Sequence, residues 1–196
     1  MLLDVCFGTR TAWKILFVLA EAPGKAVTRK EIKLLTRTGN KALTKFLMLL
    51  EKFDMVLVTK IGKTHHYKLN MSNPFAEQMT AIIKQEKQTL NNPDFVMLNI
   101  LRDFVYDVTN LNLDNLQQVI LFGSYAKRTN TAGSDIDVAL IMKKMDPGQE
   151  LMVTEIIDAI RKRYKHDIQP HYYTADEFKQ QSKLVQEIRK NGIRLI

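Results

Sequence analysis

The chain has 196 residues, of which 45% are hydrophobic and 26% are charged, the balance of an ordinary globular protein. Its length allows one large domain or two small ones. No apolar run approaches the roughly 18 residues that a membrane span needs. The start of the chain lacks the basic segment of a signal peptide, and the single cysteine, Cys6, excludes an intramolecular disulfide and a cysteine-based zinc site. We therefore expect a cytoplasmic protein without a membrane partner.

The excess of positive charge lies in the first third of the chain. The formal net charge is +8, and residues 1–70 contain 13 Lys and Arg against 5 Asp and Glu, whereas residues 71–196 contain 16 of each kind. Such a concentration is typical of a segment that binds a polyanion, for example nucleic acid. A basic surface that keeps the protein in solution would explain the same charges equally well.

Three helices and a β-hairpin are predicted within residues 8–70. Hydrophobic periodicity and turn residues predict these elements in chain order: a helix over 11–21, a short helix that begins at 28 and ends before a turn at 36–39, a helix over about 40–53, and strands over 55–60 and 64–69. The sequence of Thr28–Glu31 is a capping box, which begins the second helix. We expect Ile32 and Leu35 to face inward from that helix. Gly62, between the two strands, is typical of a hairpin turn.

This order of elements resembles the winged helix-turn-helix domain, and the stretch is similar to the DNA-binding modules of prokaryotic transcriptional regulators of the arsenical-resistance repressor type. The resemblance implies that the third helix enters the major groove of double-stranded DNA, while the hairpin, or wing, contacts the backbone or minor groove. The residues that it assigns to DNA are Asn40, Lys41, Thr44, Lys45, Lys60 and Lys63, with His65 and His66 also in the wing. Small domains of this kind also dock proteins; the positive charge on this face favours DNA.

Residues 71–115 are predicted to be a helical connector. An amphipathic helix follows Pro74, Asn91–Pro93 ends it, and a second helix follows. Helices in this position can act as a spacer, as a dimerisation element or as a cover for a sheet. We expect the second helix to cover a sheet, and the first is a candidate for pairing two copies of the chain in a homodimer.

Residues 116–196 are predicted to form an α/β domain. Two strands, a helix, a third strand and two further helices are expected there. Pro170 cannot donate a hydrogen bond to a neighbouring strand, so the third strand should be bulged or lie at an edge. The fold class expected for the whole chain is therefore α/β (α+β) with two domains, an N-terminal winged helix-turn-helix and a C-terminal mixed sheet with flanking helices, joined by the connector.

The segment Val119–Met142 carries the candidate chemistry. It reads as a buried strand, a turn that contains Gly123 and Ser124, a short basic helical start, a polar loop and a second strand with Asp135 and Asp137. Alternate residues of a strand share a face, so these two carboxylates point the same way. Like charges held side by side repel one another, and a divalent cation with a preference for oxygen ligands relieves that repulsion. The pattern therefore predicts a metal site.

This segment resembles the signature of the minimal nucleotidyltransferases in the DNA polymerase beta-like superfamily, G-S-x-A-R-G-x5-S-D-x-D-L. The matching residues are Gly123, Ser124, Ala126, Ser134, Asp135 and Asp137, and the departures are Lys127, Arg128 and Val138, where Arg, Gly and Leu are usual. The resemblance implies a nucleoside triphosphate such as ATP as substrate and Mg²⁺ at up to two sites, with Asp135 and Asp137 as metal ligands and catalytic residues. It implies nucleotide contacts from Gly123, Ser124, Lys127, Arg128 and Ser134.

Catalytic members of the superfamily carry a third carboxylate on the next strand. Alignment of the T-A-D-E-F sequence that follows this strand places Gln169 at the position of that acid, with Asp167 two residues earlier on the same face. Either Asp167 substitutes through a shifted register and is catalytic, or the site binds metal and nucleotide without efficient transfer. His171 shares the same face, where it either assists or is a packed histidine.

Two functions are compatible with these patterns. The first is a Mg²⁺-dependent nucleotidyltransferase that transfers a nucleotide to an unknown hydroxyl acceptor, protein or small molecule, and carries a DNA-binding winged helix. The second is a DNA-binding transcriptional regulator whose nucleotidyltransferase-like domain binds nucleotide and metal but is weak or inactive. Minimal nucleotidyltransferases also act as antitoxins that modify a partner, so the resemblance implies a third function as well.

Overall fold

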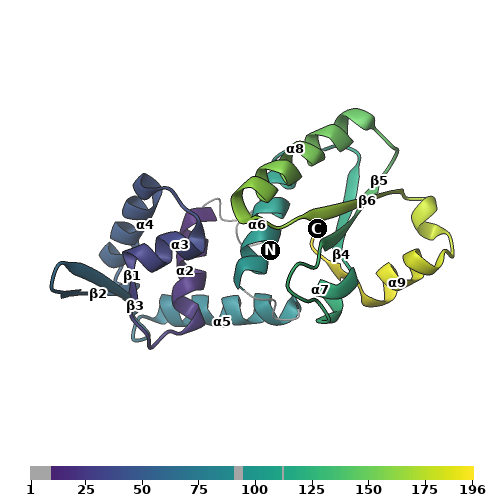
Figure 1. The fold of residues 1–196 in the computed structure, drawn as a ribbon. Helices are drawn as coiled ribbons and strands as arrows, with labels where there is room; N and C mark the ends of the chain where they lie inside the picture. Colours follow the sequence, from purple (N-terminus) through teal and green to yellow (C-terminus); the bar gives the residue numbers. More distant parts are fainter. Residues whose placement is uncertain (1–9, 91–94, 112) are drawn as a thin grey trace. The chain divides into compact units, whose positions relative to one another are not determined.

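The computed structural model describes residues 10–90, 95–111 and 113–196. They form two compact units, residues 10–88 and residues 89–196, each built around its own sheet (Figure 1). Both units mix helices and strands, in agreement with the expected α/β class. Cys6 and the predicted helix break at 91–93 lie outside the described residues. Within the described part of the chain, no helix combines the length and apolar character that a membrane crossing requires.

The first unit contains the helices and the hairpin that the sequence predicts. Its elements are α2 (Arg10–Glu21), β1 (Val27–Thr28), α3 (Arg29–Thr36), α4 (Asn40–Lys52), β2 (Val56–Ile61), β3 (Thr64–Leu69) and α5 (Pro74–Thr89). The strands form an antiparallel sheet in the order β1-β3-β2. Gly62 has a φ of 60°, a left-handed conformation that glycine adopts without a steric penalty, and it makes the tight turn between β2 and β3.

Helix α3 begins at the predicted capping box. The backbone N–H of Glu31 donates to Oγ1 of Thr28 at 3.3 Å, and the backbone N–H of Thr28 donates to Oε2 of Glu31 at 2.7 Å. Ile32 is fully buried, as expected. The inward prediction for Leu35 was wrong, because its side chain is 41% exposed. Thr36 is buried in its place, one turn after Ile32, and its hydroxyl donates to the Ile32 carbonyl at 2.7 Å.

The two helices of the predicted connector belong to different units. All of α5 up to Gln88 lies in the first unit, and α6 (Phe95–Asn110) lies in the second. Asn73 closes the segment before α5, because its side-chain amide donates to the carbonyl of Asp54 at 3.1 Å and its Oδ1 accepts from the N–H of Phe75 at 2.9 Å. The start of α5 is therefore attached to the unit of the hairpin.

The second unit contains a four-stranded mixed sheet. After α6 its elements are β4 (Leu116–Leu121), α7 (Gly123–Lys127), β5 (Ile136–Met142), α8 (Pro147–Tyr164), β6 (Ile168–Thr174), the short 3₁₀ helix η1 (Glu177–Lys179), α9 (Lys183–Asn191) and β7 (Ile193–Arg194). The strand order is β6-β5-β4-β7, with β5 and β6 parallel and the other pairs antiparallel. Strand β6 lies at an edge, as Pro170 predicts.

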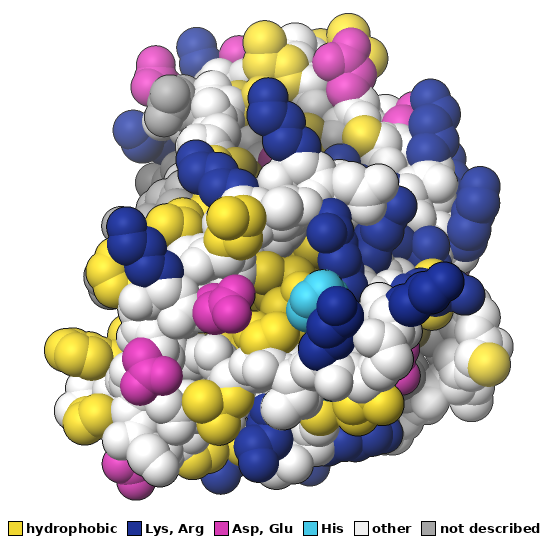
Figure 2. All heavy atoms as spheres, turned by 90° about the vertical axis from the view of Figure 1, so that its left-hand side faces the viewer, with side chains coloured by type: hydrophobic (Ala, Val, Ile, Leu, Met, Phe, Trp, Pro, Cys, Tyr) yellow, Lys and Arg dark blue, Asp and Glu magenta, His cyan; other side chains and the backbone are white. Residues whose placement is uncertain are grey.

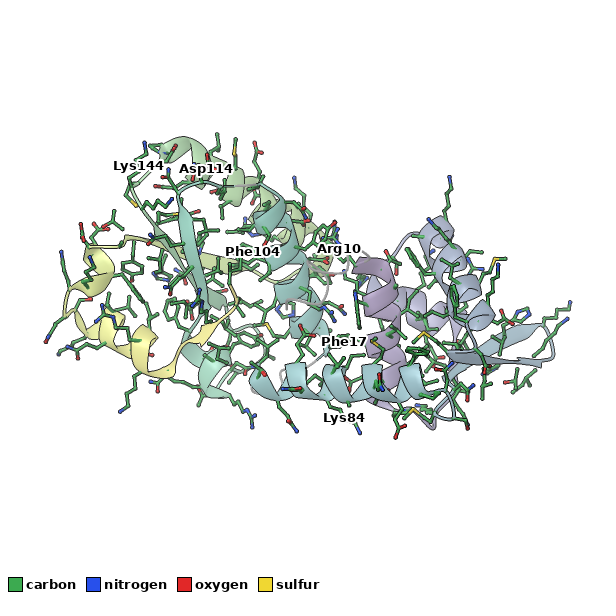
Figure 3. The ribbon with its side chains drawn as sticks, turned by 180° about the vertical axis from the view of Figure 1, so that it is seen from behind. Arg10, Phe17, Lys84, Phe104, Asp114 and Lys144 are labelled. Carbon is green, nitrogen blue, oxygen red and sulfur yellow. The ribbon has the colours of Figure 1, made fainter. Side chains whose placement is uncertain are left out.

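The two faces of this sheet pack against different helices. Helices α6 and α8 lie on one side, and α7 and α9 lie on the other (Figure 1). On the second side, residues of β4, β5, α9 and the turn after β4 form one buried cluster: Ile120, Phe122, Ala139, Ile141 and Ile188. Asp137 shares this face because it precedes Ala139 by two residues. Asp114 and Lys144, labelled in Figure 3, mark the opposite end of the β4–β5 pair, where Leu116 pairs with Met142.

A buried carboxylate links α6 to α8. Asp103 is fully buried, and its Oδ2 accepts hydrogen bonds from the hydroxyl of Tyr164 at 2.7 Å and from Nη1 of Arg163 at 2.6 Å. Burial raises the pKa of the Tyr164 phenol, so this hydroxyl stays a neutral donor. These hydrogen bonds to the buried carboxylate stabilise the contact between the helices. Removal of the carboxylate would take this acceptor away from Tyr164 and Arg163, at a cost in stability.

We predict that Asp103→Ala lowers the free energy of unfolding of the second unit by about 3 kcal/mol, because breaking a buried ion pair costs far more than a surface change. The exposed Asp114→Ala is the matched control and should stay within about 0.5 kcal/mol of the parent protein. Urea denaturation followed by circular dichroism measures both. Equal effects of the two substitutions would contradict a structural role for Asp103.

Candidate functional site

The turn after β4 touches the carboxylate of Asp137. Gly123 begins α7 with a φ of 70°, and a Cβ built on it would overlap Oδ2 of Asp137. One residue earlier, the backbone N–H of Phe122 donates to the carbonyl of Asp137 at 3.0 Å. Both the left-handed conformation and the close approach require glycine at this position. The Gly-Ser turn and the carboxylate strand therefore form one compact site.

Asp137 lies in an anionic environment. Its side chain is 24% exposed, whereas Asp135 stands just before β5 and is exposed. Burial raises the pKa of Asp137; the nearby His171 opposes this shift, and the negative charges of Asp135 and Glu187 add to it. The structure thus brings both predicted carboxylates together with a third acid from α9, Glu187, that the sequence pattern did not identify. A cation at this point would relieve the repulsion.

The neighbouring strand places an amide and an imidazole beside Asp137. In the parallel pair of β5 and β6, Asp137 is opposite Gln169, so the position expected for a third carboxylate holds a neutral side chain. His171, two residues further along β6, has its Nε2 3.8 Å from Oδ1 of Asp137. The His171 ring packs edge-on against Phe122, with centroids 5.1 Å apart.

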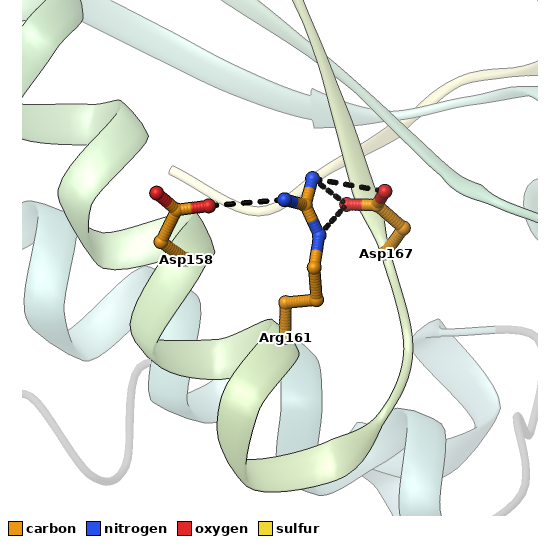
Figure 4. Close-up of polar contacts among 3 residues, drawn as sticks. All are labelled: Asp158, Arg161 and Asp167. Carbon is orange, nitrogen blue, oxygen red and sulfur yellow. Dashed lines mark hydrogen bonds and ion pairs between the residues drawn. The ribbon is translucent and has the colours of Figure 1, made fainter.

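Asp167 is bound to α8. Its carboxylate accepts hydrogen bonds from Nε and Nη2 of Arg161 at 3.0 and 2.7 Å, and Asp158 occupies the remaining side of the guanidinium at 3.0 Å (Figure 4). This two-pronged pairing holds Asp167 at the C-terminal end of α8. Among the residues that the structure describes, no three His, Cys, Asp or Glu side chains are placed so that they could hold a metal ion together.

Comparison with known proteins identifies the family. Residues 107–196 match the model described as "Polymerase beta, Nucleotidyltransferase". A protein of Methanocaldococcus jannaschii named "Putative protein adenylyltransferase" is 36% identical over 74 residues, which cover 37% of this chain and 72% of that protein. This chain belongs to the polymerase beta nucleotidyltransferase family. Membership of this family supports nucleotidyl transfer as the general activity of the chain. The matched segment contains the whole Gly123–Asp137 site.

The other signature residues of this nucleotidyltransferase stabilise the loop between β4 and β5. Lys127 forms an ion pair with Glu187 of α9. Ser134 accepts a hydrogen bond from the backbone N–H of Thr131 at 2.9 Å. Arg128 has a φ of 60°, the left-handed conformation that suits the glycine usual at this signature position. Together with Ala126 and Asn191, Lys127 and Arg128 line an open hollow of about 550 Å³.

A second candidate site lies in the first unit, between α3, α4 and the hairpin. A cavity of about 550 Å³ is lined by Thr28, Arg29, Lys30, Lys33, Asn40, Lys63, Thr64, His65 and Tyr67. It brings together Asn40 and Lys63, both predicted to contact DNA. Among its described lining residues there is no acid, and Figure 2, which looks onto this unit, shows Lys and Arg side chains over much of the face.

The cavity adds Arg29, Lys30 and Lys33 of α3, which the sequence analysis did not assign to DNA. Their spacing on a helix was the available signal, since residues three and four apart share a face. Of the other predicted contacts, Lys41, Lys45 and Lys60 are exposed. Thr44 accepts a hydrogen bond from Nη2 of Arg29 at 2.5 Å, so part of its hydrogen-bonding capacity is used within the unit.

We predict that Gly123→Ala lowers the free energy of unfolding of the second unit by about 1–3 kcal/mol more than Gly133→Ala, because an overlap in a packed site adds to the backbone cost. Gly133 is the matched control: its φ is 93°, and an added Cβ would meet nothing within 4 Å. Urea denaturation measures both.

The same comparison in an Asp137→Ala background isolates the contact. Removal of the carboxylate should abolish the excess cost of Gly123→Ala and leave Gly133→Ala unchanged, the non-additivity expected of two residues in contact. An excess that persists without the carboxylate would place the overlap elsewhere.

Proposed function

We propose that this protein transfers the nucleotide of a nucleoside triphosphate to a hydroxyl group and that its first unit is a winged helix that binds double-stranded DNA. The catalytic half rests on the contact between Gly123 and Asp137, which sets the phosphate-binding turn of the signature directly against a carboxylate. The name of the Methanocaldococcus jannaschii relative supports ATP as the donor and a protein as the acceptor.

Asp135 and Asp137 suit one Mg²⁺ ion in this proposal. Mg²⁺ is commonly bound through one or two carboxylates, with substrate phosphates and water as the other ligands. When bound, the ion would stabilise the negative charge that builds up on the departing pyrophosphate. The backbone N–H groups of the turn and the hydroxyl of Ser124 would donate to the triphosphate. A second Mg²⁺ would need a further donor, because Gln169 supplies no charge.

Three contacts favour the second candidate function, a DNA-binding regulator with weak transfer. The neutral Gln169 stands beside Asp137, and Arg161 holds the carboxylate of Asp167. Glu187 pairs with Lys127, and this lysine would otherwise be available to bind a phosphate. In this function the C-terminal unit binds nucleotide and metal, and the bound nucleotide is the signal that the DNA-binding regulator senses. The two functions differ in the rate of pyrophosphate release.

For the DNA half, the basic cavity of the first unit supports the proposal. A phosphate group is recognised by clustered cations and backbone donors. Lys33 and Lys63 come from α3 and the hairpin, so both elements would contact one phosphate backbone. The concentration of the chain's net charge in residues 1–70 is consistent with this arrangement.

The test of transfer is pyrophosphate release with each labelled triphosphate, Mg²⁺ and candidate protein acceptors. We predict that Asp137→Asn lowers the rate roughly 100-fold or more, the scale on which removal of groups that stabilise transition-state charge acts. Asp167→Asn should change the rate less than twofold, because Arg161 already holds that carboxylate. Gln169→Asp should raise the rate, because it supplies the missing acid beside Asp137.

These variants also separate the two functions. Wild-type turnover that depends on Asp137 supports the enzyme. Turnover that begins only with Gln169→Asp supports the regulator. A large loss in Asp167→Asn would support the enzyme and contradict the regulator, and it would show that this carboxylate acts in the reaction in spite of its pairing with Arg161.

The test of DNA binding is fluorescence anisotropy of a labelled duplex at several salt concentrations. We predict that Lys33→Ala with Lys63→Ala weakens binding roughly tenfold and lowers the slope of log affinity against log salt by about 2, one for each phosphate contact. Lys52→Ala with Lys84→Ala removes the same charge from exposed positions outside the cavity and is the control; Lys84 is labelled in Figure 3. Equal losses in the two pairs would show that net charge alone determines the binding.

A further inference from the structure

The imidazole of His171 lies at the carboxylate site. Its strand register sets it opposite Ala139, two residues beyond Gln169, on the face that carries Asp137. The Nε2 atom is buried, and the described residues offer it no hydrogen-bond partner. Its separation from Oδ1 of Asp137, 3.8 Å, is too long for a hydrogen bond.

The imidazole is held in a defined orientation. Phe122, the residue before Gly123, packs against the ring in an edge-to-face arrangement with an interplanar angle of 71°. The same Phe122 donates its backbone N–H to the Asp137 carbonyl. The residue that fixes the Asp137 backbone therefore also positions the ring of His171, with Nε2 on the side of the carboxylate.

The distance suits two ligands of one metal ion. Neighbouring ligands with bonds of about 2.1 Å lie about 3 Å apart, so an approach of less than about 1 Å would bring Nε2 and Oδ1 onto the same ion. No three acidic or imidazole side chains are assembled for this purpose among the described residues. A bound triphosphate supplies further oxygen ligands, so the ligand set would be completed by substrate.

We propose that His171 is a metal ligand of this nucleotidyltransferase, with Nε2 of His171 and Oδ1 of Asp137 on the same divalent ion. The inference rests on the proposed function, because it assigns a ligand to that same site. His171 takes the place of the third carboxylate that Gln169 does not supply. A nitrogen donor favours the transition-metal ions over Mg²⁺, so the site should bind Mn²⁺ more tightly than Mg²⁺.

The competing interpretation is that protonated His171 is a charge partner of Asp137. The two predict opposite effects of His171→Gln. A ligand contributes to metal affinity, so its loss weakens binding of the ion. A charge partner competes with the ion for Asp137, so its loss leaves binding unchanged or strengthens it.

The experiment is pulsed electron paramagnetic resonance of Mn²⁺ bound to the full chain without a histidine tag, in the presence of inorganic tripolyphosphate. This probe contains no nitrogen, so modulation from a directly bound ¹⁴N would come from the protein. We predict ¹⁴N modulation in the wild type, its replacement by the ¹⁵N pattern in protein labelled with ¹⁵N-histidine, and its loss in His171→Gln. His166→Gln, from the same unit, is the control and should keep the modulation.

Titration of the same samples measures Mn²⁺ affinity. We expect His171→Gln to weaken Mn²⁺ binding roughly tenfold or more relative to His166→Gln, with a smaller effect on Mg²⁺. Mn²⁺ that binds through Asp137 without ¹⁴N modulation would overturn the assignment, and so would unchanged or tighter binding in His171→Gln. The wild-type spectrum decides this even if a variant fails to fold.

The result is independent of turnover. Nitrogen coordination with no pyrophosphate release from any triphosphate would contradict the transferase and leave the ligand assignment in place. Turnover that depends on Asp137, together with a nitrogen-free Mn²⁺ site, would support the transferase and overturn the role of His171.

Discussion

The close approach of Gly123 to Asp137 is the constraint on which the site depends. It requires a glycine with positive φ at the end of β4 and a carboxylate on the facing position of β5. The antiparallel pairing of the two strands, which runs from Leu116–Met142 to Leu121–Val138, delivers these two residues to the same end of the sheet. The hydrophobic cluster under α9 holds that end in place, because Ile120 and Phe122 alternate with the residues that pack on the other face.

The charged and polar side chains around this contact differ from those that the family signature implies. The charges of Asp135 and Glu187 act on Asp137, and Lys127 is paired with Glu187. The guanidinium of Arg161 binds Asp167. The donors next to Asp137 on β6 are therefore an amide and an imidazole. The proposed cation would therefore be bound by a different set of ligands from three carboxylates.

The two units differ in charge as well as in fold. The basic first unit gathers cations of α3 and the hairpin around one cavity, while the remainder of the chain is balanced. Its arrangement of three helices and a hairpin supports the proposed winged helix, and the family match lies in the second unit. The proposed recognition of a polyanion and the proposed nucleotide chemistry thus lie in separate parts of the chain.

Local patterns in the sequence determined much of this protein. The helices and strands, the capping box at Thr28 and the edge position of β6 follow from spacing, caps and a proline, which act on neighbouring residues. The pairing of Asp135 with Asp137 on one face follows from the strand period. The sequence places Gly123 in the turn before the carboxylate strand, but its contact with Asp137 does not follow from a local pattern.

Tertiary structure decided the partners of the charged and polar side chains. The sequence left open whether Asp167 reaches the site, and the return of the chain after α8 decided that it meets Arg161. The register of β5 and β6 set Gln169 and His171 around Asp137, and the fold of the hairpin set Lys63 near Lys33. These contacts join residues from different elements, and their distances depend on how the elements pack, which no local pattern contains.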